Sequence, residues 1–257
     1  MFPYLIKAKD AVLDILFPPI CLNCQKPIDD RNKLICEKCL SLIRLNNTLF
    51  CPVCRARLAE NKKICHYDSQ YLLAAAGNYD DPVLQNLIRY FKYKYLKGLA
   101  PILGEIAVNY IRNLKLEIRN FAVVPIPLHP AKERQRGFNQ SKLIAEFLSK
   151  KLNLELIEPL KRIKNTEPQA KLKDQDKRNE NILGCFEINP HTKREWSPLA
   201  KDNFYSRSGV GVKNSIKGKN ILLIDDVFTS GATINEAVKI LKINGTSKII
   251  ALVIAKA

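Results

Sequence analysis

The chain has 257 residues, of which 46% are hydrophobic and 26% charged, close to the averages for globular proteins. This balance excludes wholesale disorder, and the lack of any stretch of about 20 uncharged apolar residues argues against a membrane-spanning helix. The 42 lysines and arginines exceed the 25 aspartates and glutamates, for a net charge of +17, which favours anionic partners such as phosphates, nucleic acid or an acidic membrane surface.

The first twenty residues mix apolar positions with charges. Four charged residues interrupt the apolar ones: Lys7, Lys9, Asp10 and Asp14. The segment therefore lacks the unbroken apolar core and the small-residue cleavage site of a signal peptide. We predict a short amphipathic helix that ends before Pro18 and docks on the protein itself, with membrane contact as the alternative. Because no export signal is visible, we expect a cytoplasmic protein.

Seven of the eight cysteines lie before residue 66 in a regular spacing. They form three CxxC pairs and one further position: Cys21 and Cys24, Cys36 and Cys39, Cys51 and Cys54, then Cys65. Each pair can form a knuckle with two thiolates, and a tetrahedral zinc ion needs two such halves. Disulfides would require an oxidising compartment, and redox chemistry at one CxxC does not explain three pairs. We predict structural zinc, since this segment has too few large apolar residues to fold on burial alone.

Four cysteines complete a first zinc site: Cys21, Cys24, Cys36 and Cys39. A second group, formed by Cys51, Cys54 and Cys65, lacks a fourth cysteine at the matching position, which is Asp68. Both Asp68 and the adjacent His66 are acceptable zinc ligands, and we favour His66 because imidazole is the softer donor. Spacing alone leaves open an empty second site, and also a crossed arrangement in which the first knuckle pairs with the third.

From residue 71 onward, strand patterns alternate with helix patterns. Apolar runs predict strands at 71–79, 121–126, 154–157, 183–188, 219–224 and 249–254, and spacings of three and four predict helices at 82–95, 99–111, 140–152 and 234–241. This alternation predicts a mostly parallel sheet covered on both faces. We expect two domains, an N-terminal helix with the zinc-binding region in 1–70 and an α/β domain in 71–257. Two polar stretches, 161–181 and 191–219, exceed ordinary loop lengths, as functional loops often do.

The most informative run is 221–233, with the sequence ILLIDDVFTSGAT. Its four apolar residues predict a buried strand that ends at Asp225 and Asp226, and a turn rich in hydroxyls and glycine then begins a helix. In open α/β sheets, ligands bind beyond the carboxyl ends of the strands, and a helix N-terminus binds phosphate through its free N–H groups. A carboxylate only accepts hydrogen bonds, which suits the hydroxyls of a sugar. The run therefore predicts a sugar-phosphate site.

Other phosphate-site patterns fit this run less well. The patterns GxxxxGK[ST] and GxGxxG are both absent. Acidic pairs at strand ends also occur in response-regulator-like and magnesium-phosphatase sites, and a purely structural helix cap is a further alternative. Two adjacent acids after four core residues are costly unless they have a role. The sugar-phosphate interpretation requires both carboxylates to face a cavity and not to be bound by internal lysines or arginines.

The run 221–233 resembles the phosphoribosyl pyrophosphate (PRPP) signature of type I phosphoribosyltransferases, and the wider pattern is similar to the ComF family. Besides the knuckle cysteines, the features that carry this resemblance are Phe17-Pro-Pro, Phe91-Lys-Tyr, the segment VPIPLHPAKERQRGFNQ at 124–140, Thr166-x-x-Gln169, Arg178-x-x-Asn181 and Phe186. The resemblance covers nearly the whole chain. It implies a type I phosphoribosyltransferase-like, Rossmann-like α/β domain that follows a double zinc ribbon.

The resemblance also assigns parts of the chain to PRPP. The ribose hydroxyls would meet Asp225 and Asp226. The 5′-phosphate would lie in the turn formed by Thr229, Ser230, Gly231, Ala232 and Thr233. The pyrophosphate would bind to a loop at 125–137 and to a flexible loop at 161–178, where the bidentate donors are Arg134, Arg136 and Arg178. Mg²⁺ would bridge pyrophosphate and ribose oxygens.

For function, the resemblance implies a protein of natural transformation that handles imported single-stranded DNA, with DNA-uptake or helicase proteins as partners. A catalytic member would transfer the phosphoribosyl group to a nitrogenous nucleophile. No residue identifies that acceptor, and His129 is either a base reader or a residue that shapes its loop. The alternative is a non-catalytic single-stranded DNA-binding or PRPP-sensing factor.

Residues 90–97 interleave aromatic rings with lysines. Such a pattern can stack bases and neutralise phosphates, although a helix turns about half of such rings to the core.

Overall fold

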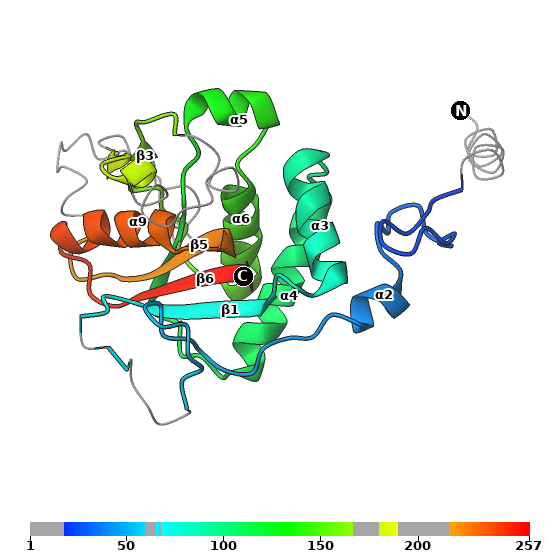
Figure 1. Ribbon diagram of the computed structural model, residues 1–257, viewed down its shortest axis with the longest axis horizontal. Coiled ribbons are helices and arrows are strands. Elements are labelled where there is room, and N and C mark those ends of the chain that lie inside the picture. The colour runs from blue at the N-terminus through cyan, green and yellow to red at the C-terminus, as the bar shows by residue number, and fades with distance from the viewer. Residues whose placement is uncertain (1–17, 60–64, 67, 167–179, 190–215) are drawn as a thin grey trace, which may run out of the picture.

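The computed structural model describes residues 18–59, 65–66, 68–166, 180–189 and 216–257. Its centre is a parallel sheet, in which the order of strands is β1 (Leu72–Asn78), β6 (Ile249–Lys256), β5 (Asn220–Phe228) and β2 (Phe121–Pro125) (Figure 1). The predicted parallel sheet is confirmed. The predicted N-terminal helix, Arg178 and most of the stretch 191–219 lie outside the described residues.

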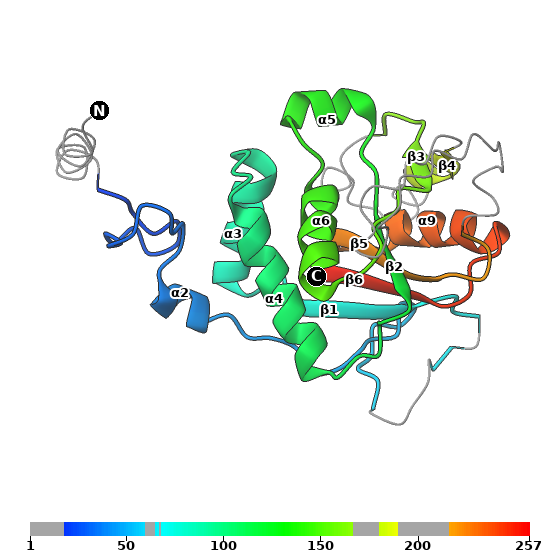
Figure 2. The same cartoon turned by 180° about the vertical axis from the view of Figure 1, so that it is seen from behind.

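Helices cover both faces of this sheet, as Figures 1 and 2 show from opposite sides. One face carries α3 (Pro82–Tyr93), α4 (Leu99–Asn113) and α6 (Gln140–Leu152), and the other carries α9 (Ala232–Ile243). Successive strand residues point to opposite faces, so Leu222 packs with the three-helix side and Leu223 with the α9 side. Burial on both faces explains why the strands read as continuous apolar runs.

Local sequence explains where the helices begin. The Asp81 side chain accepts hydrogen bonds from the N–H groups of Val83 and Leu84 at the start of α3, and Pro82 occupies the first helical position, where no N–H is needed. Asn139 caps α6 in the same way. These caps fix the ends of the two helices that border the acid pair described below.

Three elements differ from the prediction. Residues 130–136 form a short helix, α5 (Pro130–Arg136), within the segment expected to be a loop. An antiparallel pair, β3 (Leu160–Arg162) and β4 (Phe186–Ile188), stands apart from the main sheet. The segment predicted as a strand at 154–157 makes only a single parallel bridge, between Leu156 and Val123. β4 lies within the strand predicted at 183–188, whereas β3 is too short to carry a periodicity that can be recognised in sequence.

The cysteine-rich segment is attached to the edge of the sheet. It contains a short helix, α2 (Glu37–Ser41), and then runs along β1. The N–H of Asn46 donates to the carbonyl of Ala76 at 2.8 Å, and the N–H of Phe50 donates to Leu73 at 2.8 Å. These bonds pair the outer edge of β1. Among the described helices, none combines the length and the apolar character needed to cross a bilayer.

Candidate functional site

Seven of the eight cysteines gather in two clusters that could each hold a metal ion, within the described part of the chain. One consists of Cys21, Cys24, Cys36 and Cys39, the other of Cys51, Cys54, Cys65 and His66, and the ligand atoms within each cluster lie no more than 4.8 Å apart. The Cys24 and Cys36 sulfurs are 3.8 Å apart. Zinc–sulfur bonds of about 2.3 Å at tetrahedral angles place sulfurs at about this separation. The first knuckle therefore pairs with the second, which excludes the crossed arrangement.

Backbone N–H groups prepare the first cluster for a metal. The N–H of Cys36 donates to the sulfur of Cys21 at 3.4 Å, and the N–H of Cys39 donates to the sulfur of Cys36 at 3.4 Å. Burial would raise the pKa of Cys21, but hydrogen bonds from the backbone at Cys36, Cys24 and Asn23 lower it to about 6. These bonds favour the thiolate, which is the form that binds zinc.

His66 provides the fourth ligand atom of the second cluster. Its Nδ1 lies 3.4 Å from the sulfur of Cys51 and 3.3 Å from that of Cys65. Asp68, the other candidate, lies outside the cluster and is exposed. The donor set of three sulfurs and one imidazole nitrogen suits zinc in a closed structural site.

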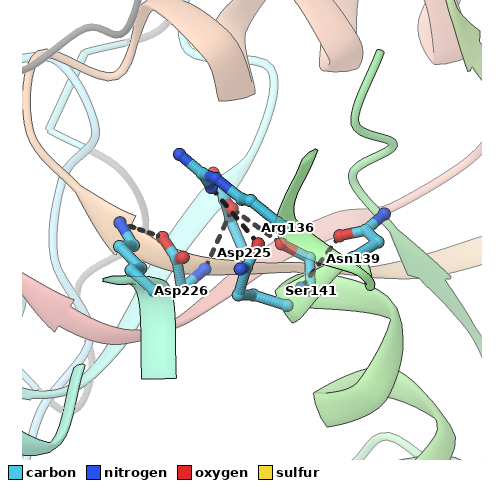
Figure 3. Close-up of polar contacts among 7 residues, drawn as sticks. Arg136, Asn139, Ser141, Asp225 and Asp226 are labelled. Carbon is cyan, nitrogen blue, oxygen red and sulfur yellow. Dashed lines mark hydrogen bonds and ion pairs between the residues drawn. The ribbon is translucent and has the colours of Figure 1, made fainter. Parts of the chain in front are cut away.

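The acid pair lies near the carboxyl end of β5 and contacts two helices (Figure 3). The strand continues through both acids to Phe228, beyond its predicted end. The hydroxyl of Ser141 in α6 donates to Oδ1 of Asp225 at 2.9 Å, and the N–H of Asp226 donates to the same oxygen at 2.9 Å. The ammonium group of Lys92 in α3 lies 2.8 Å from Oδ1 of Asp226.

The two carboxylates and Lys92 form a coupled set of charges. Burial and then the neighbouring Asp226 charge raise the pKa of Asp225 to about 6, although Lys92, the Asp226 N–H and Ser141 oppose this rise. Burial would lower the pKa of Lys92, but the Asp226 carboxylate outweighs it and raises that pKa. Both partners of the ion pair are largely shielded, with side chains 20% and 11% exposed. Above a pH of about 6, Asp225 is therefore ionised.

The ion pair with Lys92 runs against the requirement that both acids be free of internal cations. The ion pair weakens the assignment of Asp226 to the ribose hydroxyls. Asp225 is less affected, because its contacts are a hydroxyl and an N–H. A carboxylate has about four acceptor sites, so one ammonium does not exhaust Asp226. Sequence reasoning missed this role of Lys92, even though the residue lies in the Phe91-Lys-Tyr motif.

The turn before α9 has the backbone of an anion site. Gly231 occupies the capping position with a φ of 84° and offers no side-chain cap to α9, whose first N–H, that of Ala232, donates to the hydroxyl of Ser230 at 3.3 Å. A Cβ atom at Gly231 would lie 2.7 Å from the ring of Phe228, so only glycine fits there. The cavity lined by Asp225 and residues 227–234 measures about 20 Å³. This volume holds about one water.

The predicted arginines occupy different environments. Arg134 is exposed on α5, whereas Arg136 is half-buried and donates to Oε1 of Gln140 at 3.3 Å. Arg178 is outside the described residues. His129 accepts the N–H of Ala131 at 3.2 Å and caps α5, which is the loop-shaping role. Two further half-buried cations, Lys132 and Arg162, were missed by sequence reasoning, although the four-residue spacing of Lys132 and Arg136 marks one face of a helix.

Comparison with known proteins agrees with this architecture. A double zinc ribbon domain matches residues 12–67, and a phosphoribosyl transferase domain matches residues 141–257. The chain is thus a phosphoribosyltransferase-like α/β protein with an N-terminal double zinc ribbon.

The chain is similar to proteins of known name over most of its length. It is 25% identical to competence protein F of Haemophilus influenzae, over 89% of this chain and 93% of the relative. It is 28% identical to competence protein ComFC of Bacillus subtilis, over 86% and 77%, and 24% identical to DNA utilization protein YhgH of Escherichia coli K12, over 90% and 94%. Together with the two matching domain models, these relatives show that the chain is similar to ComF-type competence proteins over most of its length.

Proposed function

We propose that this protein binds PRPP with Mg²⁺ at the acid pair and the α9 turn, and that it acts in DNA uptake in the cytoplasm. One observation carries the proposal: two adjacent carboxylates near the carboxyl end of β5 are followed directly by the glycine turn that begins α9. The role in DNA uptake rests on the names of its relatives, two of which are competence proteins and one a DNA utilization protein.

Each part of PRPP has a matching group in this site. The N–H groups of α9 and the hydroxyls of Thr229, Ser230 and Thr233 suit the 5′-phosphate. The ribose hydroxyls donate to Asp225, which is ionised above a pH of about 6, and to the acceptor sites that Lys92 leaves open on Asp226. The ammonium of Lys92 offsets the charge of the second carboxylate until the sugar binds.

If the protein is an enzyme, its reaction is phosphoribosyl transfer. Mg²⁺, bound through substrate oxygens, would neutralise charge on the leaving pyrophosphate. Arg136, half-buried on α5, adds positive charge for the same purpose. The acid pair holds the ribose so that its C1 faces the acceptor, a positioning role that lowers the entropic cost of the transfer.

A second candidate function, single-stranded DNA binding without catalysis, has its own supporting observation. Tyr93 and Tyr95 are 55% and 49% exposed at the end of α3, and two lysines lie beside them in the chain, Lys94 and Lys97. Exposed rings among lysines suit base stacking and phosphate neutralisation. Phe91 of the same run is fully buried, so only part of the predicted aromatic surface remains.

Calorimetry with Mg-PRPP and with a single-stranded oligonucleotide separates the two functions. We expect the wild type to bind PRPP, and Asp225→Asn with Asp226→Asn to lose about tenfold or more in affinity, because hydrogen bonds to charged groups are lost. The matched control is Asp29→Asn with Asp30→Asn, an exposed pair of adjacent acids. Salt-dependent DNA binding that survives the site variant, with no PRPP binding by the wild type, would contradict the first function and support the second.

A further inference from the structure

The second cysteine cluster lies beside the turn that begins α9. A cavity of about 440 Å³ lies between them and is lined by both, by Val53 of the knuckle and by Ser230 of the turn. The cluster is built from two segments of the chain, the knuckle at 51–54 and the ligands at 65–66, which a bound metal ion would join. Each of these two segments leads to one side chain that contacts the region of the turn.

Arg55 follows the last cysteine of the knuckle and reaches the residue at the end of β5. Its N–H donates to the carbonyl of Cys51 at 2.8 Å, and in this closed knuckle Arg55 has a φ of 61°. Residues other than glycine rarely adopt this conformation, so the knuckle sets the direction of the Arg55 side chain. The guanidinium lies over the ring of Phe228, 5.8 Å from its centroid, where a cation is attracted to the ring. The first knuckle has Gln25 at the matching position, with a φ of 57°, so the backbone is common to both knuckles and the cation is not.

Tyr71 connects the other segment of the cluster to α9. The N–H of Ser69 donates to the carbonyl of the ligand His66 at 3.1 Å, and the hydroxyl of Ser69 donates to the carbonyl of Tyr71 at 3.0 Å. Tyr71 is buried, and its hydroxyl donates to Oδ1 of Asn235 in the first turn of α9 at 2.6 Å. This bond orients the amide of Asn235, because it assigns the oxygen to Tyr71 and leaves Nδ2 near Gly231.

Phe228 and Asn235 support the same point of the turn. A Cβ atom at Gly231 would lie 2.7 Å from the ring of Phe228 and 3.6 Å from Nδ2 of Asn235. The N–H of Asn235 also donates to the carbonyl of Gly231 at 2.8 Å. Arg55 and Tyr71 therefore contact the two side chains that pack against the glycine of the turn, and a metal ion in the second cluster would hold both contacts in place.

We propose that the second zinc cluster positions the α9 turn for a phosphate, with Arg55 and Tyr71 as positioning residues that act through Phe228 and Asn235. The phosphate part of this inference rests on the proposed binding of PRPP. A bound phosphate needs several N–H groups directed at one place. A turn that loses its support should open more often, and should then bind phosphate more weakly. The zinc ribbon is thereby coupled to the phosphoribosyltransferase-like domain at this turn.

Hydrogen exchange measures the turn directly, without any ligand. In the zinc-bound full chain, we expect the backbone N–H groups of residues 229–233 to exchange about tenfold faster in Arg55→Gln and in Tyr71→Phe than in the wild type. Arg57→Gln and Tyr79→Phe are the matched controls and should leave this rate unchanged. Arg57 is an exposed arginine two residues after Arg55, and Tyr79 follows β1 directly as Tyr71 precedes it.

Two rescues distinguish positioning from general damage. Arg55→Lys keeps a cation for the ring of Phe228 and should exchange at close to the wild-type rate. His66→Ala removes a ligand of the second cluster and should accelerate exchange at 229–233 as Arg55→Gln does. His66→Cys should reverse that effect, because a cysteine thiolate is also a zinc ligand.

Two partial ligands test whether the position of the turn serves the phosphate. Ribose 5-phosphate probes the turn, and Mg-pyrophosphate probes the other end of PRPP. In calorimetry, we expect Arg55→Gln and Tyr71→Phe each to weaken the binding of ribose 5-phosphate by about threefold to tenfold. The affinity for Mg-pyrophosphate should change less than about twofold. An equal loss for both ligands would mean general damage to the fold and would overturn the inference.

Two further results would contradict it. Exchange at 229–233 that neither variant changes would show that the cluster does not position the turn. Faster exchange with an unchanged affinity for ribose 5-phosphate would show that this position does not serve the phosphate. If the wild type binds no ribose 5-phosphate, the proposed function fails and with it the phosphate part of the inference. The exchange rates then still decide whether the second cluster positions the turn.

Discussion

Asp225 and Asp226 are neighbours in the chain, but their charges affect the stability of the folded protein differently. Asp226 is compensated by Lys92 at 2.8 Å. Asp225 is held by the hydroxyl of Ser141 and a backbone N–H, and burial with the Asp226 charge raises its pKa to about 6. The folded protein therefore binds more protons than the unfolded chain between about pH 4 and pH 6, and this group's contribution to stability is lost as pH rises through that interval. At neutral pH, the site holds one carboxylate that destabilises the fold.

Asp225→Asn should stabilise the protein at neutral pH. The amide oxygen retains the bonds from Ser141 and from the N–H of Asp226, while the buried charge disappears. We expect the free energy of unfolding to rise by about 1–2 kcal/mol at about pH 8, and the gain to shrink at about pH 5.5, where the wild-type acid is largely protonated. Urea unfolding at the two pH values measures this difference.

Asp226→Asn is the matched comparison, and its effect should have the opposite sign. It leaves the ammonium of Lys92 largely buried without its carboxylate, so stability should fall by about 1–3 kcal/mol at about pH 8. If both variants change stability in the same direction, the two acids do not differ as their contacts indicate.

The contacts of the acid pair also show which features of the site could be predicted from the sequence and which could not. Residue types and their order predicted the acids, the glycine turn and the knuckle cysteines, because those signals are local. The hydroxyl that holds Asp225 comes from Ser141, 84 residues away in the chain, and the cation on Asp226 comes from Lys92 in another helix. Such pairings depend on helix packing, which no short pattern encodes.

At the scale of elements, α4 and α6 pack closely because α4 contains a glycine. An added Cβ at Gly104 would lie 2.2 Å from Cδ1 of Phe147 in α6. The side chain of Phe147 therefore lies directly against the backbone of α4. This packing fixes the position of α6, whose first turn carries Ser141 to the acid pair.

Gly104→Ala should destabilise the protein even though alanine is the better helix former. The clash outweighs a gain of about 1 kcal/mol in helix propensity, and we expect a net loss of about 1–3 kcal/mol in thermal or urea unfolding. Adding Phe147→Leu, which removes the ring, should restore part of that loss. A Gly104→Ala protein as stable as the wild type would mean that the two helices separate at no cost.

The longer elements were predictable from sequence, and of the short strands β4 lies within the strand predicted at 183–188, whereas β3 was missed. The predicted helix at 140–152 coincides with α6, and the predicted strand at 249–254 lies within β6. The predicted helix at 82–95 was wrong at its C-terminal end, because α3 ends at Tyr93 and Tyr95 adopts a positive φ of 57°. β3 is defined only by its antiparallel partner β4, from which it is separated by more than twenty residues. Tertiary pairing thus decides elements that are too short to carry a pattern of their own.

At the scale of the whole molecule, the two metal clusters are anchored differently. Cys21 and Cys39 are buried within the larger apolar core, together with residues of α3 and α4. In the second cluster only Cys51 is buried, and both Cys54 and Cys65 are exposed. We therefore expect the second cluster to release zinc more readily than the first, without unfolding of the α/β domain.

His66→Ala should lower the zinc content from two ions per chain to one, because three sulfurs hold zinc less tightly than a complete tetrahedral set, and His66→Cys should restore it. Zinc is counted with a chromogenic chelator after thiol modification, and the melting transition reports on the α/β domain. Asp68→Ala is the control, since this carboxylate lies outside the cluster and its removal should leave two ions bound.

Because Phe50, beside Cys51, pairs with Leu73 of β1, the sheet should keep its edge partner after the second ion leaves. Loss of an ion in Asp68→Ala and not in His66→Ala would reassign the fourth ligand, and unfolding of the whole chain with one ion still bound would show that the sheet depends on the second cluster.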